Sequence, residues 1–93
     1  MKIIFVYDIS LENNEDNKRL NKVRKIARKY LYHVQKSVFE GNLTYSKLYK
    51  LEREIMQVID KNRDSIIIYI LPDGVRMERK ILTNIRDPLD NII

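Results

Sequence analysis

Asp8 is the first residue of the chain whose type and position could support chemistry. It follows an apolar run at residues 3–7, which predicts a strand covered on both faces. A carboxylate where a strand ends can hold a metal ion or act as a general base. It can equally form a turn, in which its side chain accepts the backbone N–H of Ser10 two residues ahead. This stretch alone leaves both interpretations open.

A single carboxylate is a poor site for a hard cation, because protein-bound Mg²⁺ usually takes one or two carboxylates together with several waters. A homodimer would change this. If the first strands lie near a two-fold axis, Asp8 of each chain faces its twin, and one sequence position supplies two carboxylates. An ion held there could activate water and clamp a phosphodiester.

A cluster of basic residues follows the acidic start of the chain. Residues 8–16 contain four acids and no base, whereas residues 17–31 contain seven bases and no acid. The apolar residues of 17–31 recur with helical spacing, so the segment predicts a helix with a basic outer side. Such a helix suits the phosphates of a nucleic acid, and the alternative is a solvated cationic face. The candidate nucleic-acid-binding residues are Lys18, Arg19, Lys22, Arg24 and Arg28.

The remaining elements must position these residues. Asp16 or Asn17 is expected to cap the first helix. Residues 32–43 are extended, as one long strand or as two short ones. A second helix is expected over 45–60 after Thr44, then a buried strand over 66–71 and a possible edge strand over 76–83.

This order predicts two helices on one face of an antiparallel sheet, which is an α+β ferredoxin-like fold. The other sheet face must be wetted or covered, and a second copy could cover it. A chain of 93 residues is small enough to gain core from a partner, so a homodimer is expected.

The composition excludes several classes of protein. The chain has no cysteine, so it has neither a disulfide framework nor a Cys-based zinc site, and two glycines cannot build a phosphate loop. The single His33 is expected to be structural. No apolar run is long enough to span a membrane and no signal-peptide pattern is present, so we expect a cytoplasmic protein without a membrane partner.

We expect four tyrosines to pack in the core or at its rim rather than to stack on bases: Tyr30, Tyr32, Tyr45 and Tyr49.

Several segments in order along the chain carry a family resemblance: the strand end YD, the basic helix KRLNKVRKIARKYL, VQKSVFEGNLT, DSIIIYILPD and the terminal DNII. Together they resemble the CRISPR-associated protein two family, the small subunit of spacer acquisition. The resemblance implies a single ferredoxin-like domain over 1–93, βαββαβ with an extra C-terminal strand, that forms a homodimer. Its core would span about 1–82, and a tail over 83–93 would dock on a neighbouring chain.

The resemblance also implies two functions of different classes. In the first, the dimer bridges two dimers of the CRISPR integrase, and protospacer duplex DNA lies across its basic surface. In the second, it is an endonuclease acting on RNA, including single-stranded RNA, or on DNA. The endonuclease would use paired Asp8 carboxylates as catalytic and metal-binding groups, with one Mg²⁺ or Mn²⁺ per dimer.

Individual residues match the family pattern. Tyr7 and Asp8 match the strand-end pair, and Ser37 and Phe39 match the SVF signature, where Phe39 could serve packing at a dimer interface or function. Ile92 and Ile93 match the hydrophobic tail that docks on a neighbour. Arg19 and Lys22 occupy places where the family usually has arginines. Lys22 keeps the charge for a phosphate but loses the bidentate fork of an arginine.

Overall fold

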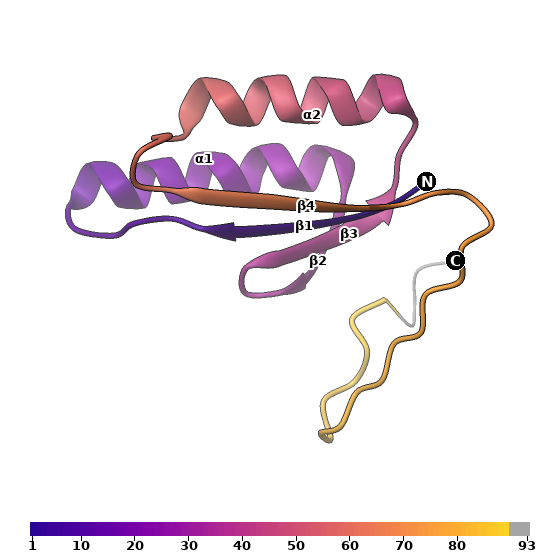
Figure 1. The fold of residues 1–93 in the computed structure, drawn as a ribbon. Helices are drawn as coiled ribbons and strands as arrows, with labels where there is room; N and C mark the ends of the chain where they lie inside the picture. Colours follow the sequence, from indigo (N-terminus) through magenta and orange to yellow (C-terminus); the bar gives the residue numbers. More distant parts are fainter. Residues whose placement is uncertain (90–93) are drawn as a thin grey trace.

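The computed structural model describes residues 1–89, which form a four-stranded antiparallel sheet with both helices on one face (Figure 1). The strands lie in the order β2–β3–β1–β4. Along the chain the elements are β1 (Lys2–Asp8), α1 (Asn14–Tyr30), β2 (Tyr32–Gln35), β3 (Val38–Asn42), α2 (Tyr45–Val58) and β4 (Ser65–Leu71). This is the ferredoxin-like βαββαβ arrangement, and it confirms the predicted fold class.

Helix α1 begins earlier than its apolar periodicity suggested. Asn13 is the N-cap, and its side chain accepts from the amide of Asp16 while the Asp16 carboxylate accepts from the amide of Asn13. The prediction that Asp16 or Asn17 caps the helix is therefore wrong. Asp16 is the third helical residue of a capping box, where its carboxylate satisfies amides that the helix leaves free.

Residues 32–43 form two strands, β2 and β3, joined by a tight connection at Lys36 and Ser37. Their ladder is irregular between His33 and Gln35. Gly41 of β3 lies against α1's end, where an added Cβ would come within 2.9 Å of Leu31 Cδ2. A larger residue there would require Leu31 to move, which gives this glycine a packing role.

Helix α2 and strand β4 agree with their predicted ranges within two residues. The Thr44 side chain accepts from the amide of Lys47 and caps α2 as expected. Leu48, Leu51 and Ile55 of α2 are buried against the sheet.

Alternation along β1 separates two faces of the sheet. Ile3, Phe5 and Tyr7 are buried under the helices. Ile4, Val6 and Asp8 point to the other face, which we call the open face. Cross-strand register adds seven residues of the neighbouring strands to the open face: Val38, Glu40, Asn42, Ser65, Ile67, Tyr69 and Leu71.

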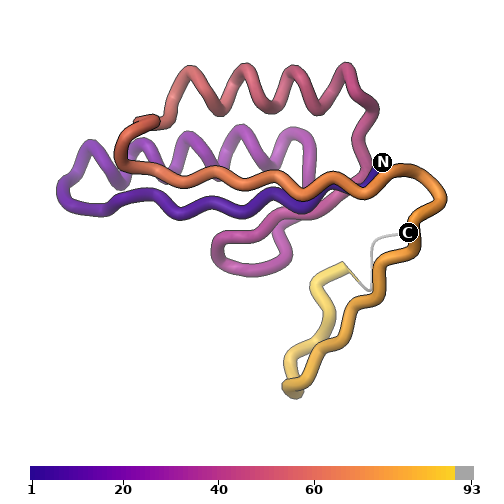
Figure 2. Tube along the Cα trace, in the orientation of Figure 1, coloured from indigo at the N-terminus to yellow at the C-terminus, as the bar shows by residue number. Residues whose placement is uncertain are grey.

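After β4 the chain runs through residues 72–89 without helix or strand and leaves on the side of the sheet opposite the helices (Figure 2). The edge strand expected over 76–83 is not formed in this single chain, because no strand of residues 1–89 pairs with it. Arg79 of this segment forms an ion pair with Glu40 of the open face. No helix in this part of the chain is both long and apolar enough to cross a membrane.

Candidate functional site

Asp8 ends β1 on the open face with its carboxylate exposed. Within residues 1–89 that carboxylate makes no hydrogen bond or ion pair. The turn interpretation is wrong, because the Ser10 amide donates to Asp64 Oδ1 at 3.1 Å instead. The oxygens of Asp8 are therefore free to bind a ligand.

One chain does not offer a metal site by itself. Among residues 1–89 no group of three or more acidic or histidine residues could hold a metal ion. A single Asp8 supplies one carboxylate, which fits a hard cation only if further ligands come from elsewhere. Its place on the open face means that a second copy packed there could bring a second Asp8.

Tyr7 is buried beside Asp8 and ties three elements together. Its hydroxyl donates to the carbonyl of Lys36 at 2.7 Å and accepts from Arg24 Nε at 3.1 Å. Its amide donates to the carbonyl of Ser37 at 3.1 Å. The signature residues Tyr7 and Ser37 therefore fix the β2–β3 connection to the end of β1, and Arg24 of α1 is drawn inward onto the same hydroxyl.

Phe39 packs inside the chain rather than on an exposed interface. Its side chain is fully buried, with its ring centroid 6.4 Å from that of Phe5 and 6.1 Å from that of Tyr7. The ring of His33, which is itself exposed, stacks on that of Phe39 with the centroids 4.5 Å apart. The tail residues Ile92 and Ile93 lie outside the described residues.

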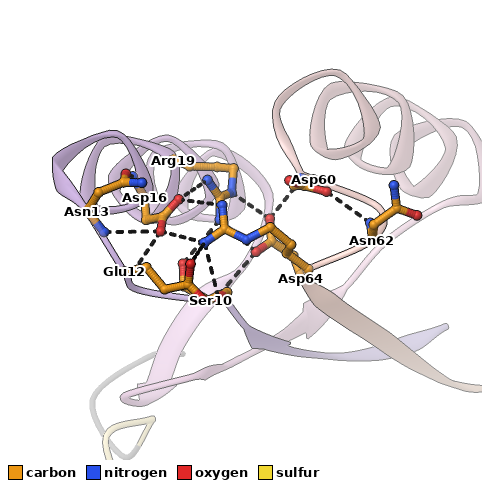
Figure 3. A network of polar contacts seen from close by, with 9 residues as sticks. Ser10, Glu12, Asn13, Asp16, Arg19, Asp60, Asn62 and Asp64 are labelled. Carbon is orange, nitrogen blue, oxygen red and sulfur yellow. Dashed lines mark hydrogen bonds and ion pairs between the residues drawn. The ribbon is translucent and has the colours of Figure 1, made fainter.

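Arg19 lies within a network of charges between the β1–α1 loop and the α2–β4 loop (Figure 3). Its guanidinium makes a bidentate contact with Asp64, with Nε to Oδ2 at 2.6 Å and Nη2 to Oδ1 at 2.9 Å. It also donates to Asp16 Oδ1 at 2.7 Å and to the carbonyl of Ser10 at 3.1 Å. These acceptors, rather than phosphates, take up the hydrogen-bond donors of Arg19.

A second arginine completes what we call the junction network: Ser10, Asp16, Arg19, Arg63 and Asp64. Arg63 Nη2 and Nη1 donate to the two oxygens of Asp16 at 2.7 and 3.0 Å. The carboxylates of Asp16 and Asp64 are 1% and 0% exposed. Since each buried carboxylate faces at least one guanidinium, the network joins two loops with its charges paired.

Hydrogen bonds from arginine shift the pKa values of these acids. The pKa of Asp16 lies well below its ordinary value, chiefly because Arg63 and then Arg19 donate to it. Burial raises the pKa of Asp64, but the Arg19 guanidinium and the amides of Asp60 and Ser10 outweigh it, and the pKa is lowered. Both acids are therefore ionised at neutral pH.

The rest of the predicted basic surface does face solvent. Lys18, Lys22, Lys25 and Arg28 are exposed and recur on the outer side of α1, and we call them the basic face. Within residues 1–89, Lys18 pairs with Glu15 at 3.3 Å, while Lys22, Lys25 and Arg28 form no ion pair. Of the five residues predicted to bind nucleic acid, the structure leaves Lys18, Lys22 and Arg28 outward and turns Arg19 and Arg24 inward.

The tyrosines also differ from expectation. Tyr30 packs against the core as predicted, and its hydroxyl also donates to Glu54. Tyr32 is instead 51% exposed, and Tyr45 and Tyr49 on α2 are 81% and 60% exposed, so the packing prediction is wrong for these three. Tyr45 and Tyr49 lie to one side of the buried Leu48–Leu51–Ile55 stripe of α2.

Asp64 and Arg63 are the residues that the sequence did not single out. Arg63 and Asp64 are 47 and 48 residues beyond Asp16, in a loop whose composition suggests only a turn. No local pattern marks them, because their partners are defined by the pairing of β1 with β4.

The fold and the site define a small ferredoxin-like domain with a basic outer helix and a free strand-end carboxylate on its open sheet face. The model of a family described as "CRISPR associated protein Cas2" matches residues 1–90. The chain belongs to the Cas2 family, a family of CRISPR systems, and the resemblance seen in the sequence is confirmed.

Curated relatives and solved structures agree with this assignment. A Moorella thermoacetica protein named CRISPR-associated endoribonuclease Cas2 2 is 48% identical over 98% of this chain and 100% of its own length. The Methanocaldococcus jannaschii protein named CRISPR-associated endoribonuclease Cas2 is 38% identical over 100% of this chain and 76% of its own. The crystal structure of Streptococcus pyogenes Cas2 at pH 6.5 superposes with a TM-score of 0.72 at 31% identity, covering 85% of this chain and 100% of that one.

Proposed function

We propose that this protein is a structural subunit of CRISPR spacer acquisition. As a homodimer it bridges dimers of the integrase, and it binds protospacer duplex DNA through phosphates without reading its sequence. The observation that carries this proposal is the basic face of α1, where Lys22, Lys25 and Arg28 are exposed and form no ion pair within residues 1–89. Cations without carboxylate partners are available to phosphates, and their binding releases counterions from the duplex.

The homodimer of this proposal is supported by the open face. Ile67 and Tyr69 are 47% and 55% exposed there, and Ile4, Val6 and Val38 are only partly covered. An antiparallel sheet with an apolar outer face gains stability when a second layer covers it. The C-terminal segment, whose Leu82 and Ile85 are 84% and 73% exposed, would then reach a neighbouring chain.

The test reverses the charges of the basic face. Lys22→Glu, Lys25→Glu and Arg28→Glu together should weaken binding of a blunt duplex at least about tenfold and reduce spacer integration with the partner integrase. Lys61→Glu, at an exposed lysine of the α2–β4 loop without an ion pair within residues 1–89, is a control that reverses a charge of the same sign away from α1. Unchanged duplex affinity in the triple variant, with the fold intact by circular dichroism, would refute a duplex path along α1.

A second candidate function is a metal-dependent endonuclease, and the free carboxylate of Asp8 favours it. The names of several relatives, such as the endoribonuclease of Moorella thermoacetica, point the same way. Two Asp8 side chains across the open faces would hold one Mg²⁺ or Mn²⁺, which when bound supplies an activated water. Tyr7 would keep the end of β1 in place through its bonds to the β2–β3 connection.

Asp8→Asn separates the two functions. Wild type and variant are compared for cleavage of labelled RNA and duplex DNA with Mg²⁺, Mn²⁺ or EDTA, and for spacer integration. Metal-dependent cleavage that vanishes in Asp8→Asn would establish the endonuclease. Integration by Asp8→Asn at the wild-type rate, with no cleavage by either protein, would leave the bridging function alone.

A further inference from the structure

Helix α2 carries a second surface of a different kind from the basic face of α1. Tyr45 and Tyr49 lie four residues apart on one side of α2 and are 81% and 60% exposed. Two rings this exposed on one side of a helix form a surface that a ligand could cover, because tyrosine combines a large apolar ring with a polar hydroxyl.

The charges around these rings favour an anionic ligand. The Arg53 guanidinium lies over the Tyr49 ring, 5.8 Å from its centroid, and Lys50 is exposed next to Tyr49 in the sequence. Glu52, three residues after Tyr49, is the one exposed acid of α2, since Glu54 is engaged by Lys29 and Tyr30. Aromatic rings interleaved with cations match a nucleic acid, whose bases offer flat faces and whose backbone offers negative charge.

The start of α2 adds to this positive character. Its first turn contains no acid, whereas the first turn of α1 contains Glu15 and Asp16. Carboxylates of the first turn therefore offset the positive end of the helix dipole in α1 but not in α2, where the nearby Asp73 carboxylate pairs with the Met1 amino group at 2.8 Å. Tyr45 stands in that first turn of α2, so a phosphate beside its ring would lie where the dipole favours an anion.

The spacing of the rings distinguishes single strands from duplexes. Residues four apart on a helix are separated by about 6 Å along its axis. Bases stacked within a duplex are about 3.4 Å apart on each strand and present no free flat face. The rings of Tyr45 and Tyr49 can therefore each stack on a base only if the bases of the strand are unpaired and separated from one another.

We propose that the outer side of α2 binds single-stranded nucleic acid, with Tyr45 and Tyr49 stacking on unpaired bases and Lys50 and Arg53 contacting the backbone. This inference rests on the proposed nucleic-acid function and extends it to a second class of ligand. The same protein would then hold duplex on α1 and an unpaired segment on α2, on adjacent helices of one layer (Figure 1).

The experiment compares two labelled probes, a short oligothymidylate and a blunt duplex, by fluorescence anisotropy. Tyr45→Leu with Tyr49→Leu should weaken oligothymidylate binding about tenfold and change duplex binding less than about twofold. Both positions are exposed, so the fold should survive, and circular dichroism checks this. Tyr32→Leu is the matched control, since Tyr32 is 51% exposed but lies on β2.

Photocrosslinking gives a readout that does not depend on affinity. An oligothymidylate carrying iododeoxyuridine should crosslink to Tyr45 or Tyr49, as identified by mass spectrometry of the peptides. Equal oligothymidylate affinity in wild type and double variant, or adducts confined to α1, would overturn the inference while leaving duplex binding standing. Failure of wild type to bind either probe would overturn both the inference and the proposed function.

The same variants also test two other occupants of this surface, a second copy of the chain and the integrase. If the double variant loses the dimer by light scattering, or loses the integrase in a pull-down, while keeping oligothymidylate affinity, the tyrosines belong to a protein interface. That result would also overturn the inference.

Discussion

The junction network and the basic face both take basic residues from α1, and Arg19 of the first lies less than one helical turn from Lys22 of the second. Arg19 is 13% exposed and contacts two buried carboxylates, whereas Lys22 is exposed and has no ion pair within residues 1–89. What separates them is the direction in which each leaves the helix: three residues rotate a side chain by about 300°, so the two point about 60° apart, and only Arg19 reaches the carboxylates of Asp16 and Asp64. Basic residues of one helix can therefore serve the fold or a ligand according to their helical position.

The two regions also differ in the free-energy cost of removing their charges from water. A buried arginine is tolerated only where carboxylates replace its water, so Arg19 is useful only together with Asp16 and Asp64. An exposed lysine keeps its water until a ligand comes. The junction network should therefore control stability, and the basic face should control affinity and its salt dependence.

The largest expected effect comes from Asp64→Ala. It removes the bidentate partner of Arg19 and the acceptor for the amides of Ser10 and Asp60, which leaves buried donors without partners. We expect the melting temperature to fall by roughly 10 °C or more for a domain of this size, measured by circular dichroism. Glu15→Gln, which removes only the exposed pair with Lys18, should shift it hardly at all. Similar melting temperatures for both variants would remove the distinction between the two regions.

The second-largest expected effect is the loss of stability at acid pH, which comes from the junction network. Because the pKa values of Asp16 and Asp64 are lowered in the folded chain, the unfolded chain takes up protons at a higher pH than the folded one. Their stabilisation is therefore complete at neutral pH, begins to decline below about pH 5, and is lost as pH falls through the folded pKa values.

Denaturant titrations at several pH values measure this effect. The free energy of unfolding of wild type should fall more steeply between about pH 5 and pH 3 than that of Asp64→Asn, which has one fewer such carboxylate. Parallel pH profiles for the two proteins would show that Asp64 is not held ionised by Arg19.

The smallest and sharpest effect is on the salt dependence of duplex binding. Lys22→Gln should reduce the slope of log K against log salt by about 0.9 if Lys22 contacts one phosphate. Arg19→Gln should leave that slope unchanged at a temperature where the variant is folded, because its guanidinium is occupied by Asp16 and Asp64. The affinity of both variants is measured over a range of salt concentrations. A reduced slope for Arg19→Gln would place Arg19 on the DNA and contradict the assignment made from its contacts.

Local patterns predicted much of the architecture. The apolar run before Asp8, the helical spacing from Leu20 to Leu31 and the β-branched run of β4 led to the ferredoxin-like order that the structure confirms. Two errors concerned the elements: the cap of α1 is Asn13, and the edge strand over 76–83 is not formed in the single chain. The others, which include the Asp8 turn, the packing of Tyr45 and Tyr49 and the exposure of Arg19, concerned where one side chain goes, and neighbouring residues do not determine this.

The sequence by itself determined which segments are helices and strands, because hydrophobic periodicity and capping act between residues a few positions apart. It also determined the position of Asp8 at a strand end and the basic charge of α1. Only the tertiary structure decided which bases remain free. Asp64 reaches Arg19, which is 45 residues away in the sequence, because β4 pairs with β1. That pairing moves a buried carboxylate beside α1 and so separates the arginine that stabilises the fold from the lysines left to bind phosphate.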